Sequence, residues 1–346
     1  MGAVARAGRG CGDPIGRPAD RPQPDGPDII GSMDVHAEPR RPTPIRLLVL
    51  DIDGTVTDSR HEVPEGTRRA VRALVDAGIG VMLATGRRYR DALPVATRLG
   101  LDAPLVTASG ALVKSPPGHR TLHRARFAAG VLERVVGTIV AAGYEPIIYG
   151  DSFAEGFDFY CRRLEVTTAD AGGFLAEYLS RNAAVARVHP ELLAAPPPDA
   201  FAGFAMGPRE AMESLEARLH EACPGALSLH ALRSPRYGHW MCEIAPADVT
   251  KWSAVARVAA DQGIASDAIC AAGDDVNDLP MITAAGLGIA MGNARPAVLA
   301  AADHVVGTND GTGIRDIADI LLARIAQSPP SPGVTTPGGC DPPRGL

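Results

Sequence analysis

Two groups of carboxylates, far apart in the chain, each follow a short apolar run. Asp51 and Asp53 come directly after Leu47–Leu50, and three more aspartates lie in 274–278, after the run Ala268–Ala272. An aspartate after a strand is often only a turn or helix-cap residue, but such caps do not need so many carboxylates. Two like charges ~4 Å apart repel by about 4 kcal/mol at an effective dielectric near 20, so a cation is expected to hold the groups together. Oxygen ligands without histidine or cysteine suit a hard ion, above all Mg²⁺.

A phosphate-binding element is predicted near a third strand end. The tripeptide Thr85-Gly86-Arg87 follows the apolar run Val81–Ala84, which places a hydroxyl, an unobstructed backbone N–H and a helix N-terminus where an anion could dock. Lys251 opens a later helix and could bring a mobile cation to the same anion. Arg87 by itself is typical of a protein surface. Beside a divalent metal, the hydroxyl, glycine and lysine together indicate a phosphoryl group, which metal and lysine would neutralise while a carboxylate attacks it.

An alternation of apolar strands and amphipathic helices is predicted to position these residues. Such an alternation is typical of an open parallel α/β sheet with helices on both faces. The strands are expected at 47–50, 81–84, 105–107, 268–272, 287–291 and 303–306, and the helices from Pro64 to Gly78 and over 88–99, 251–262, 278–285 and 314–325. Ligands bind such sheets at the carboxyl ends of the strands, where both groups of carboxylates lie.

A second, smaller α/β domain is predicted between the two halves of this sheet. Serine, proline and glycine gather at 115–118 and again at 234–238, as is typical of linkers. We therefore expect the core domain at 45–118 and 237–326 and the inserted domain at 119–236. The insert is expected to contain helices at 127–142 and 208–222 and strands at 144–149, 201–206 and 226–232.

In combination, these motifs resemble the haloacid dehalogenase-like hydrolase superfamily, most closely its Cof-type, class IIB phosphatases. The resemblance runs from Asp51 to about Ile320. It is carried by Asp51-Ile52-Asp53-Gly54-Thr55, Ala84-Thr85-Gly86-Arg87, Lys251, Gly273 to Asp278 continuing into Leu279-Pro280-Met281, Met291-Gly292-Asn293-Ala294 and Asn309-Asp310-Gly311. It implies a Mg²⁺-dependent phosphoric monoester hydrolase acting on a sugar phosphate or a phosphorylated cofactor. The implied fold is an open parallel Rossmann-like core sheet with an inserted α/β cap domain (C2, type B).

The resemblance also implies a role for each site residue. Asp51 is expected to be the nucleophile that forms an aspartyl-phosphate, and Asp53 the general acid and then the general base. The implied metal ligands are Asp51, the backbone carbonyl of Asp53 and Asp274, with Asp278 either as a ligand or close behind them. Four residues are expected to bind the phosphoryl group: Thr85, Gly86, Lys251 and Asn277. Because dehalogenases of the superfamily do not share the acid/base aspartate, dehalogenation is the less favoured reaction.

Two residues depart from the pattern of this branch. Ser109 precedes Gly110 where the branch usually has asparagine, and Trp252 follows Lys251 where glycine is common. Neither change removes a group that does the chemistry, but both bear on substrate contacts, since Trp252 would either narrow the pocket or pack against the cap.

Two weaker patterns concern the predicted joints of the insert. His119 and His123 have the i, i+4 spacing of a metal pair, but neighbouring prolines and Gly118 argue against a helix, so a solvated linker is expected. At the return joint, two interpretations stay open for four residues, which either face the active site or are ordinary hinge residues: Arg233, Arg236, Tyr237 and His239.

Composition excludes several classes of protein. The 346 residues are 46% hydrophobic and 21% charged, enough for about two folded domains. Thirty-four Lys and Arg against 40 Asp and Glu give a net charge of −6, which argues against nucleic acid as a partner. The longest uncharged stretch, 279–294, is shorter than a membrane span and contains three glycines. Six scattered cysteines suggest neither zinc nor disulfides.

The chain ends differ from the body in composition. The segments 1–44 and 327–346 hold 14 of the 30 prolines and are expected to be flexible tails, with Met33 as an alternative start of translation. The first residues lack the apolar segment of a secretory signal, so a cytoplasmic protein is expected. No segment indicates a protein partner. The alternative to an enzyme is a catalytically weak phospho-ligand-binding or regulatory protein on the same fold.

Overall fold

The computed structural model describes residues 43–165, 173–234 and 237–327. The two predicted tails and Met33 therefore lie outside the described residues, apart from the inner ends of the tails. At the C-terminal side, the last helix continues to Gln327.

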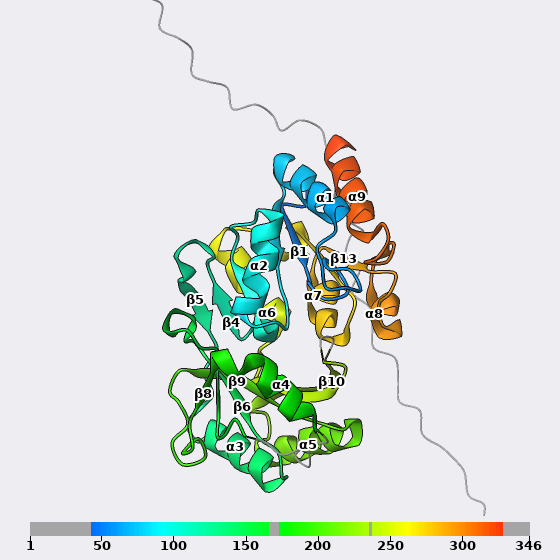
Figure 1. Ribbon diagram of the computed structural model, residues 1–346. Helices are drawn as coiled ribbons and strands as arrows, with labels where there is room; N and C mark the ends of the chain where they lie inside the picture. Colours follow the sequence, from blue (N-terminus) through cyan, green and yellow to red (C-terminus); the bar gives the residue numbers. More distant parts are fainter. Residues whose placement is uncertain (1–42, 166–172, 235–236, 328–346) are drawn as a thin grey trace, which may run out of the picture. The chain divides into compact units, whose positions relative to one another are not determined.

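A parallel sheet joins the first part of the chain to the last (Figure 1). Its strand order is β14-β13-β12-β1-β2, and all of its strand pairs are parallel, as the alternating pattern predicted. The strands are β1 (Leu47–Leu50), β2 (Gly80–Leu83), β12 (Ile269–Gly273), β13 (Leu287–Ala290) and β14 (His304–Val305). A parallel bridge from Ala84 to Val106 places β3 (Leu105–Thr107) beyond β2. Because β1 pairs with both β2 and β12, the three segments that are predicted to bind phosphate and metal follow strands that end at one edge of the sheet.

Helices cover both faces of this sheet. The face with Leu48 and Leu50 packs against three helices: α1 (Glu65–Asp76), α2 (Tyr89–Leu99) and α9 (Gly313–Gln327). The face with Leu47 and Val49 packs against α6 (Lys251–Asp261) and α7 (Leu279–Ala284), and α8 (Pro296–Ala301) packs beside α7. Strand residues alternate between the two faces, so a strand covered on both faces reads as a continuous apolar run.

The insert forms its own sheet, with strand order β10-β11-β9-β6-β7-β8. The strands are β6 (Ile147–Gly150), β7 (Phe159–Cys161), β8 (Ala186–Val188), β9 (Ala200–Gly207), β10 (Leu227–Arg233) and β11 (Trp240–Pro246). One face packs against α3 (Val131–Ala141) and α5 (Arg209–Ala222), and the other against α4 (Phe174–Asn182). The fold is therefore a parallel α/β core sheet with an inserted, mainly antiparallel α/β domain.

The two segments predicted as linkers each lie between paired strands, although 235–236 of the second fall outside the described residues. β4 (Leu112–Lys114) and β5 (Thr121–Arg124) pair antiparallel, as do β10 and β11. Proline and glycine suit tight turns as well as linkers, so composition alone did not separate the two. The predicted return to the core at 237 is also too early, because β11 completes the inserted sheet. The described chain passes between the two sheets from β5 to α3 and from β11 to α6.

The histidines of the first hairpin do not form a pair in the structure. His119 is exposed in the turn and lies 2.8 Å, by its Nδ1, from the Tyr89 hydroxyl, whereas His123 lies on β5. Only one carboxylate cluster within the described ranges has metal-site spacing, and it contains neither histidine.

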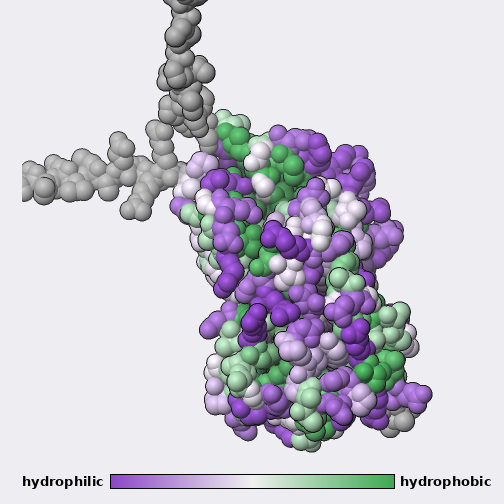
Figure 2. Space-filling view, turned by 90° about the vertical axis from the view of Figure 1, so that its left-hand side faces the viewer, coloured by the Kyte–Doolittle hydropathy of each residue, from purple (hydrophilic) through white to green (hydrophobic). Residues whose placement is uncertain are grey.

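The surface is in keeping with a buried apolar core. The face drawn in Figure 2 is mostly hydrophilic, with apolar residues in small separate areas. In the part of the chain that the structure describes, no helix is long and apolar enough to cross a membrane.

We expect Leu74→Ala in α1 to lower the free energy of unfolding by about 2–5 kcal/mol, because it would leave a cavity in the core. Leu74 is fully buried, whereas its neighbour Val75 is 39% exposed. Val75→Ala is therefore the matched control and should change stability by less than ~0.5 kcal/mol. Urea unfolding of both variants measures the difference, and equal losses would contradict this packing of α1.

Candidate active site

Strand pairing brings the two groups of carboxylates together. Leu50 of β1 is in register with Ala272 of β12, and the Asp51 backbone N–H donates to the Ala272 carbonyl at 3.1 Å. One carboxylate oxygen from each of Asp51, Asp274 and Asp278 lies within 4.8 Å of the others. The structure thus gathers residues that are more than two hundred positions apart in the sequence.

Lys251 is held between two of these carboxylates. Its Nζ donates to Asp51 Oδ1 at 2.7 Å and to Asp278 Oδ1 at 2.6 Å, and its side chain is only 2% exposed. Burial disfavours the ammonium, but the negative charges of Asp278 and Asp51 outweigh this effect and raise the pKa of Lys251. The lysine is therefore a fixed positive charge. It is placed by the N-terminus of α6, where Thr250 and Ser253 form a capping box.

Asp278 is the most deeply buried of the carboxylates. Its Oδ2 accepts hydrogen bonds from the backbone N–H groups of Asp274 and Asp275, at 3.0 and 3.1 Å. A Cβ on Gly273 would lie 2.4 Å from this carboxylate, which explains the glycine at the end of β12. Asp278 therefore shapes the loop that carries Asp274 and anchors Lys251 at the same time.

The loop after β1 fits closely against Asp274. Gly54 has a φ of +79°, and a Cβ there would lie 2.3 Å from Asp274 Oδ2. This position therefore requires glycine both for its backbone conformation and for lack of space. The Thr55 hydroxyl donates to Asp274 Oδ1 at 3.2 Å. Two residues of the later motifs support the loop, since Asn293 donates to the Gly54 carbonyl and Asn309 to the Thr57 carbonyl, each at 2.9 Å.

The charges at this edge of the sheet favour a bound cation. Burial and the nearby negative charges of Asp278 and Asp53 raise the pKa of Asp51 to about 7, although the positive charge of Lys251 acts to lower it. Burial and the charge of Asp51 raise the pKa of Asp274 to about 8. One buried ammonium does not compensate three carboxylates. An oxygen-only set of this kind fits Mg²⁺ or a similar hard divalent ion.

Asp53 has an unexpected partner. Arg87 donates to both of its oxygens, from Nε at 2.7 Å and from a terminal nitrogen at 2.6 Å, and His61 Nδ1 lies 3.3 Å from Oδ1. The arginine side chain is only 9% exposed, unlike the typical surface arginine. The Thr-Gly-Arg turn aims the guanidinium back at the end of β1, because β1 and β2 are adjacent.

A cleft of about 210 Å³ lies over the carboxylates. Seven of the eight residues predicted from the sequence line it: Asp51, Asp53, Thr85, Gly86, Lys251, Asp274 and Asn277. The eighth, Asp278, is not among the lining residues. The floor comes from the core strands, whereas the opposite wall comes from the insert and includes Tyr149 of β6, Tyr178 of α4 and Tyr237.

Sequence reasoning missed the polar residues of the wall and the rim. Arg88 donates to Asp91 at 2.8 Å and to Asn182 of α4 at 2.7 Å, and so links the core to the insert. Glu243 of β11 lines the cleft and accepts a hydrogen bond from Ser109 at 3.0 Å. The available signal was a single carboxylate within the otherwise apolar run of β11.

The residues whose roles stayed open differ in their positions. Tyr237 faces the cleft, whereas Arg233 is exposed and donates to the Gly238 carbonyl. His239 lies 3.3 Å from Glu177, and Arg236 lies outside the described residues. Trp252 packs against the apolar cluster of the core sheet rather than against the cap.

The raised pKa values predict a pH-dependent stability in the absence of divalent ions. Unfolded aspartate has a pKa of ~3.9, below those of folded Asp51 and Asp274. Their contribution to stability is therefore fully present below about pH 4 and is lost as the pH rises through 7 to 8. We expect the melting temperature in EDTA to fall between about pH 6 and 9, and millimolar Mg²⁺ to restore more of it at the higher pH. A melting temperature that is independent of Mg²⁺ at both pH values would contradict the cation site.

Comparison with known proteins identifies the family of the chain. The family model of haloacid dehalogenase-like hydrolases matches residues 48–317. The phosphatase YwpJ of Bacillus subtilis is 28% identical over 80% of this chain and 100% of its own length, and an HMP-PP phosphatase of Serratia proteamaculans is 28% identical over 72% of this chain and 85% of its own. The solved structure of a subclass IIB sugar phosphatase superposes with a TM-score of 0.64 at 19% identity, over 81% of this chain and 98% of that one, which concerns the fold alone. The chain belongs to the haloacid dehalogenase-like hydrolases and, within them, to the Cof-type phosphatases, which are phosphoric monoester hydrolases.

Proposed function

We propose that the protein hydrolyses a small phosphorylated metabolite through an aspartyl-phosphate on Asp51, with Mg²⁺ as its cofactor. The observation that carries the proposal is the placement of Asp51. Its carboxylate is fixed by Lys251 at the floor of a cleft, with Asp53 and Asp274 lining the same cleft. A buried carboxylate beside a fixed cation and a second carboxylate suits nucleophilic attack on a phosphoryl group.

In the first step, an Asp51 oxygen attacks phosphorus, and the bond from phosphorus to the leaving oxygen breaks. Asp53 donates a proton to that oxygen, so the product leaves as a neutral alcohol. Thr85, Gly86, Lys251 and Asn277 would hold the transferring group, since all four line the cleft around Asp51. Lys251 neutralises part of the charge on the phosphoryl oxygens.

In the second step, Asp53 takes a proton from water, whose oxygen attacks phosphorus. The bond between phosphorus and Asp51 breaks, which releases phosphate and regenerates the free carboxylate. Arg87 holds both oxygens of Asp53 and therefore positions the acid/base group, and the second lone pair of each oxygen remains available for proton transfer.

Mg²⁺ would be held by Asp51, Asp274 and the backbone carbonyl of Asp53. When bound, it would neutralise charge on the phosphoryl group and orient that group. Both oxygens of Asp278 already accept hydrogen bonds from the chain. Asp278 is therefore proposed to support the metal ligands through these hydrogen bonds and not to coordinate the metal itself.

The inserted domain is proposed to act as the cap that encloses the leaving group. Its residues, among them Tyr149, Tyr178 and Tyr237, form the wall opposite the carboxylates. Closure over the substrate would exclude bulk water from the reaction. The floor would contact only the phosphoryl group and does not by itself select the leaving group. We propose sugar phosphates or phosphorylated cofactors as the substrate class because the chain belongs to the Cof-type phosphatases.

Asp51→Asn is expected to lower phosphate release to the uncatalysed level, because an amide oxygen is a poor nucleophile. The assay follows phosphate release from sugar phosphates, nucleotides, flavin mononucleotide and pyridoxal phosphate, with and without Mg²⁺. Asp102→Asn is the matched control, since Asp102 is exposed on the surface. Mg²⁺-dependent turnover by Asp51→Asn would refute the assignment. If the wild-type protein binds a phosphate ester but never releases phosphate, the phospho-ligand-binding alternative is favoured.

Asp53→Asn is expected to slow turnover by about 10²–10⁴-fold, because it removes the general acid and base. With an activated phosphoryl donor such as the acyl phosphate acetyl phosphate, whose acetate leaving group needs little acid catalysis, the second step becomes limiting. Acid-quenched protein should then carry one phosphoryl group on the peptide that contains Asp51, as measured by mass spectrometry. Full turnover without any trapped phosphoenzyme would speak against the assigned roles.

A further inference from the structure

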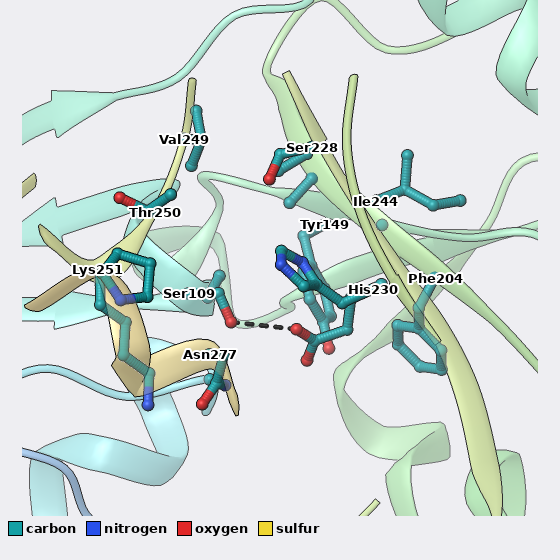
Figure 3. Close-up of a pocket in the computed structure, with 17 residues that line it drawn as sticks. Ser109, Tyr149, Phe204, Ser228, His230, Ile244, Val249, Thr250, Lys251 and Asn277 are labelled. Atoms are coloured by element: carbon teal, nitrogen blue, oxygen red, sulfur yellow. Dashed lines mark hydrogen bonds between the residues drawn. The ribbon is translucent and has the colours of Figure 1, made fainter. Parts of the chain in front are cut away.

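The core-facing side of the inserted sheet carries a carboxylate directly above the phosphate-binding turn. Glu243 lies on β11, with His230 of β10 and Phe204 of β9 as its cross-strand neighbours. Figure 3 shows Ser109, Lys251 and Asn277 on the core side of this region, opposite His230 and Phe204 of the insert. A Cβ on Gly86 would lie 3.6 Å from Glu243 Oε1. The carboxylate is therefore beside the proposed phosphoryl position, on the side where the leaving group must lie.

Ser109 fixes the direction of this carboxylate. Its hydroxyl donates to Glu243 Oε2 at 3.0 Å, the hydrogen bond drawn in Figure 3. Ser109 has a φ of +54°, a conformation that residues other than glycine rarely adopt. The next residue, Gly110, would place a Cβ 2.1 Å from the Thr250 carbonyl, so the turn is held tightly against the start of α6. A rigid turn thus presents one oxygen of Glu243 to Ser109 and leaves the other toward the cleft.

Glu243 has no ion-pair partner among the described cationic side chains of the cleft. Burial raises the pKa of Glu243, whereas its hydrogen bond from Ser109 and the charges of nearby His230 and Lys251 favour the ionised carboxylate. Among the described residues that line the cleft, each cationic side chain is paired with a carboxylate. Arg87 binds Asp53, Lys251 binds Asp51 and Asp278, and Arg88 binds Asp91. Glu243 instead binds the uncharged hydroxyl of Ser109. One terminal nitrogen of Arg88 makes no hydrogen bond, but it lies 3.6 Å from Asp158, so each lining cation already faces a carboxylate. A second anionic group on the substrate would meet Glu243 without a cation of its own, whereas a hydroxyl could donate a hydrogen bond to it.

We propose that Glu243, oriented by Ser109, determines substrate specificity by accepting hydrogen bonds from the hydroxyls of an uncharged leaving group and by disfavouring leaving groups that carry a second negative charge. This inference rests on the proposed phosphatase function. It narrows the substrate to polyhydroxylated monophosphates without a carboxylate or a further phosphate.

A pair of closely matched esters tests the inference. Glucitol 6-phosphate and 6-phosphogluconate have the same carbon chain and the same hydroxyls at C2 to C5, but C1 is a hydroxymethyl group in the first and a carboxylate in the second. We expect kcat/KM to be at least about tenfold higher for glucitol 6-phosphate, mainly through KM. Both esters are also measured as inhibitors of acetyl phosphate hydrolysis, so that binding is observed even for an ester that is not turned over.

Two variants attribute the preference to Glu243. Glu243→Gln keeps an acceptor for Ser109 but removes the charge, and should lower the ratio between the two esters at least about fivefold. Ser109→Ala removes the orienting hydrogen bond and should lower the ratio by a smaller factor. Glu210→Gln, a matched change at an exposed position of the insert, should leave the ratio unchanged. A purely structural role of Glu243 would move both esters alike and leave their ratio as it is.

The outcomes separate this inference from the proposed function. If acetyl phosphate hydrolysis is not dependent on Mg²⁺ and Asp51, the proposed function fails. If it is dependent, three results would overturn the inference alone. These are equal kcat/KM values for the two esters, an unchanged ratio of these values in Glu243→Gln, and a failure of both esters to inhibit acetyl phosphate hydrolysis.

Discussion

The buried ion triad of Lys251 with Asp51 and Asp278 is the constraint on which the rest of the site depends. A fully buried ammonium needs compensating carboxylates, and here one of them is the proposed nucleophile and the other holds the metal-site loop. The triad therefore joins β1, α6 and the turn after β12 at one point. The backbone at Gly273 passes very close to the Asp278 side chain, and the backbone at Gly110 passes very close to Thr250 and Lys251. A larger residue at either position would displace the lysine or its partner.

The sequence was sufficient for the core sheet and for the floor of the site, for a physical reason. Strands buried on both faces are continuous apolar runs, and the residues that follow such runs necessarily meet at one edge of a parallel sheet. Asp51 and Asp274 could therefore be placed together without knowledge of their distance. The same reasoning placed Thr85, Gly86 and Lys251 in the cleft, because each lies at the end of a strand or the start of a helix.

Other features could not be derived from the sequence in this way. The pairing of Arg87 with Asp53 depends on a side-chain direction, which no spacing rule specifies. The segments that join β4 to β5 and β10 to β11 contain the same residue types as linkers, so the return from insert to core was placed before β11. Tertiary pairing with β9 and β10 is what includes β11 in the inserted sheet, and this pairing is not local in the chain.

The features that the sequence predicts and those that it does not predict correspond to two different tasks of the site. The phosphoryl chemistry is the same for every substrate, and its residues sit in short motifs on the rigid core, where the sequence shows them plainly. The proposed recognition of the leaving group uses the insert, through single residues such as Glu243 and Tyr149 on strands of ordinary apolar composition. The Ser109 turn connects the two, because it belongs to the core yet its hydroxyl binds the carboxylate of the insert. A change at this turn can therefore alter which ester is accepted without moving the groups that attack it, which allows one floor to serve different substrates.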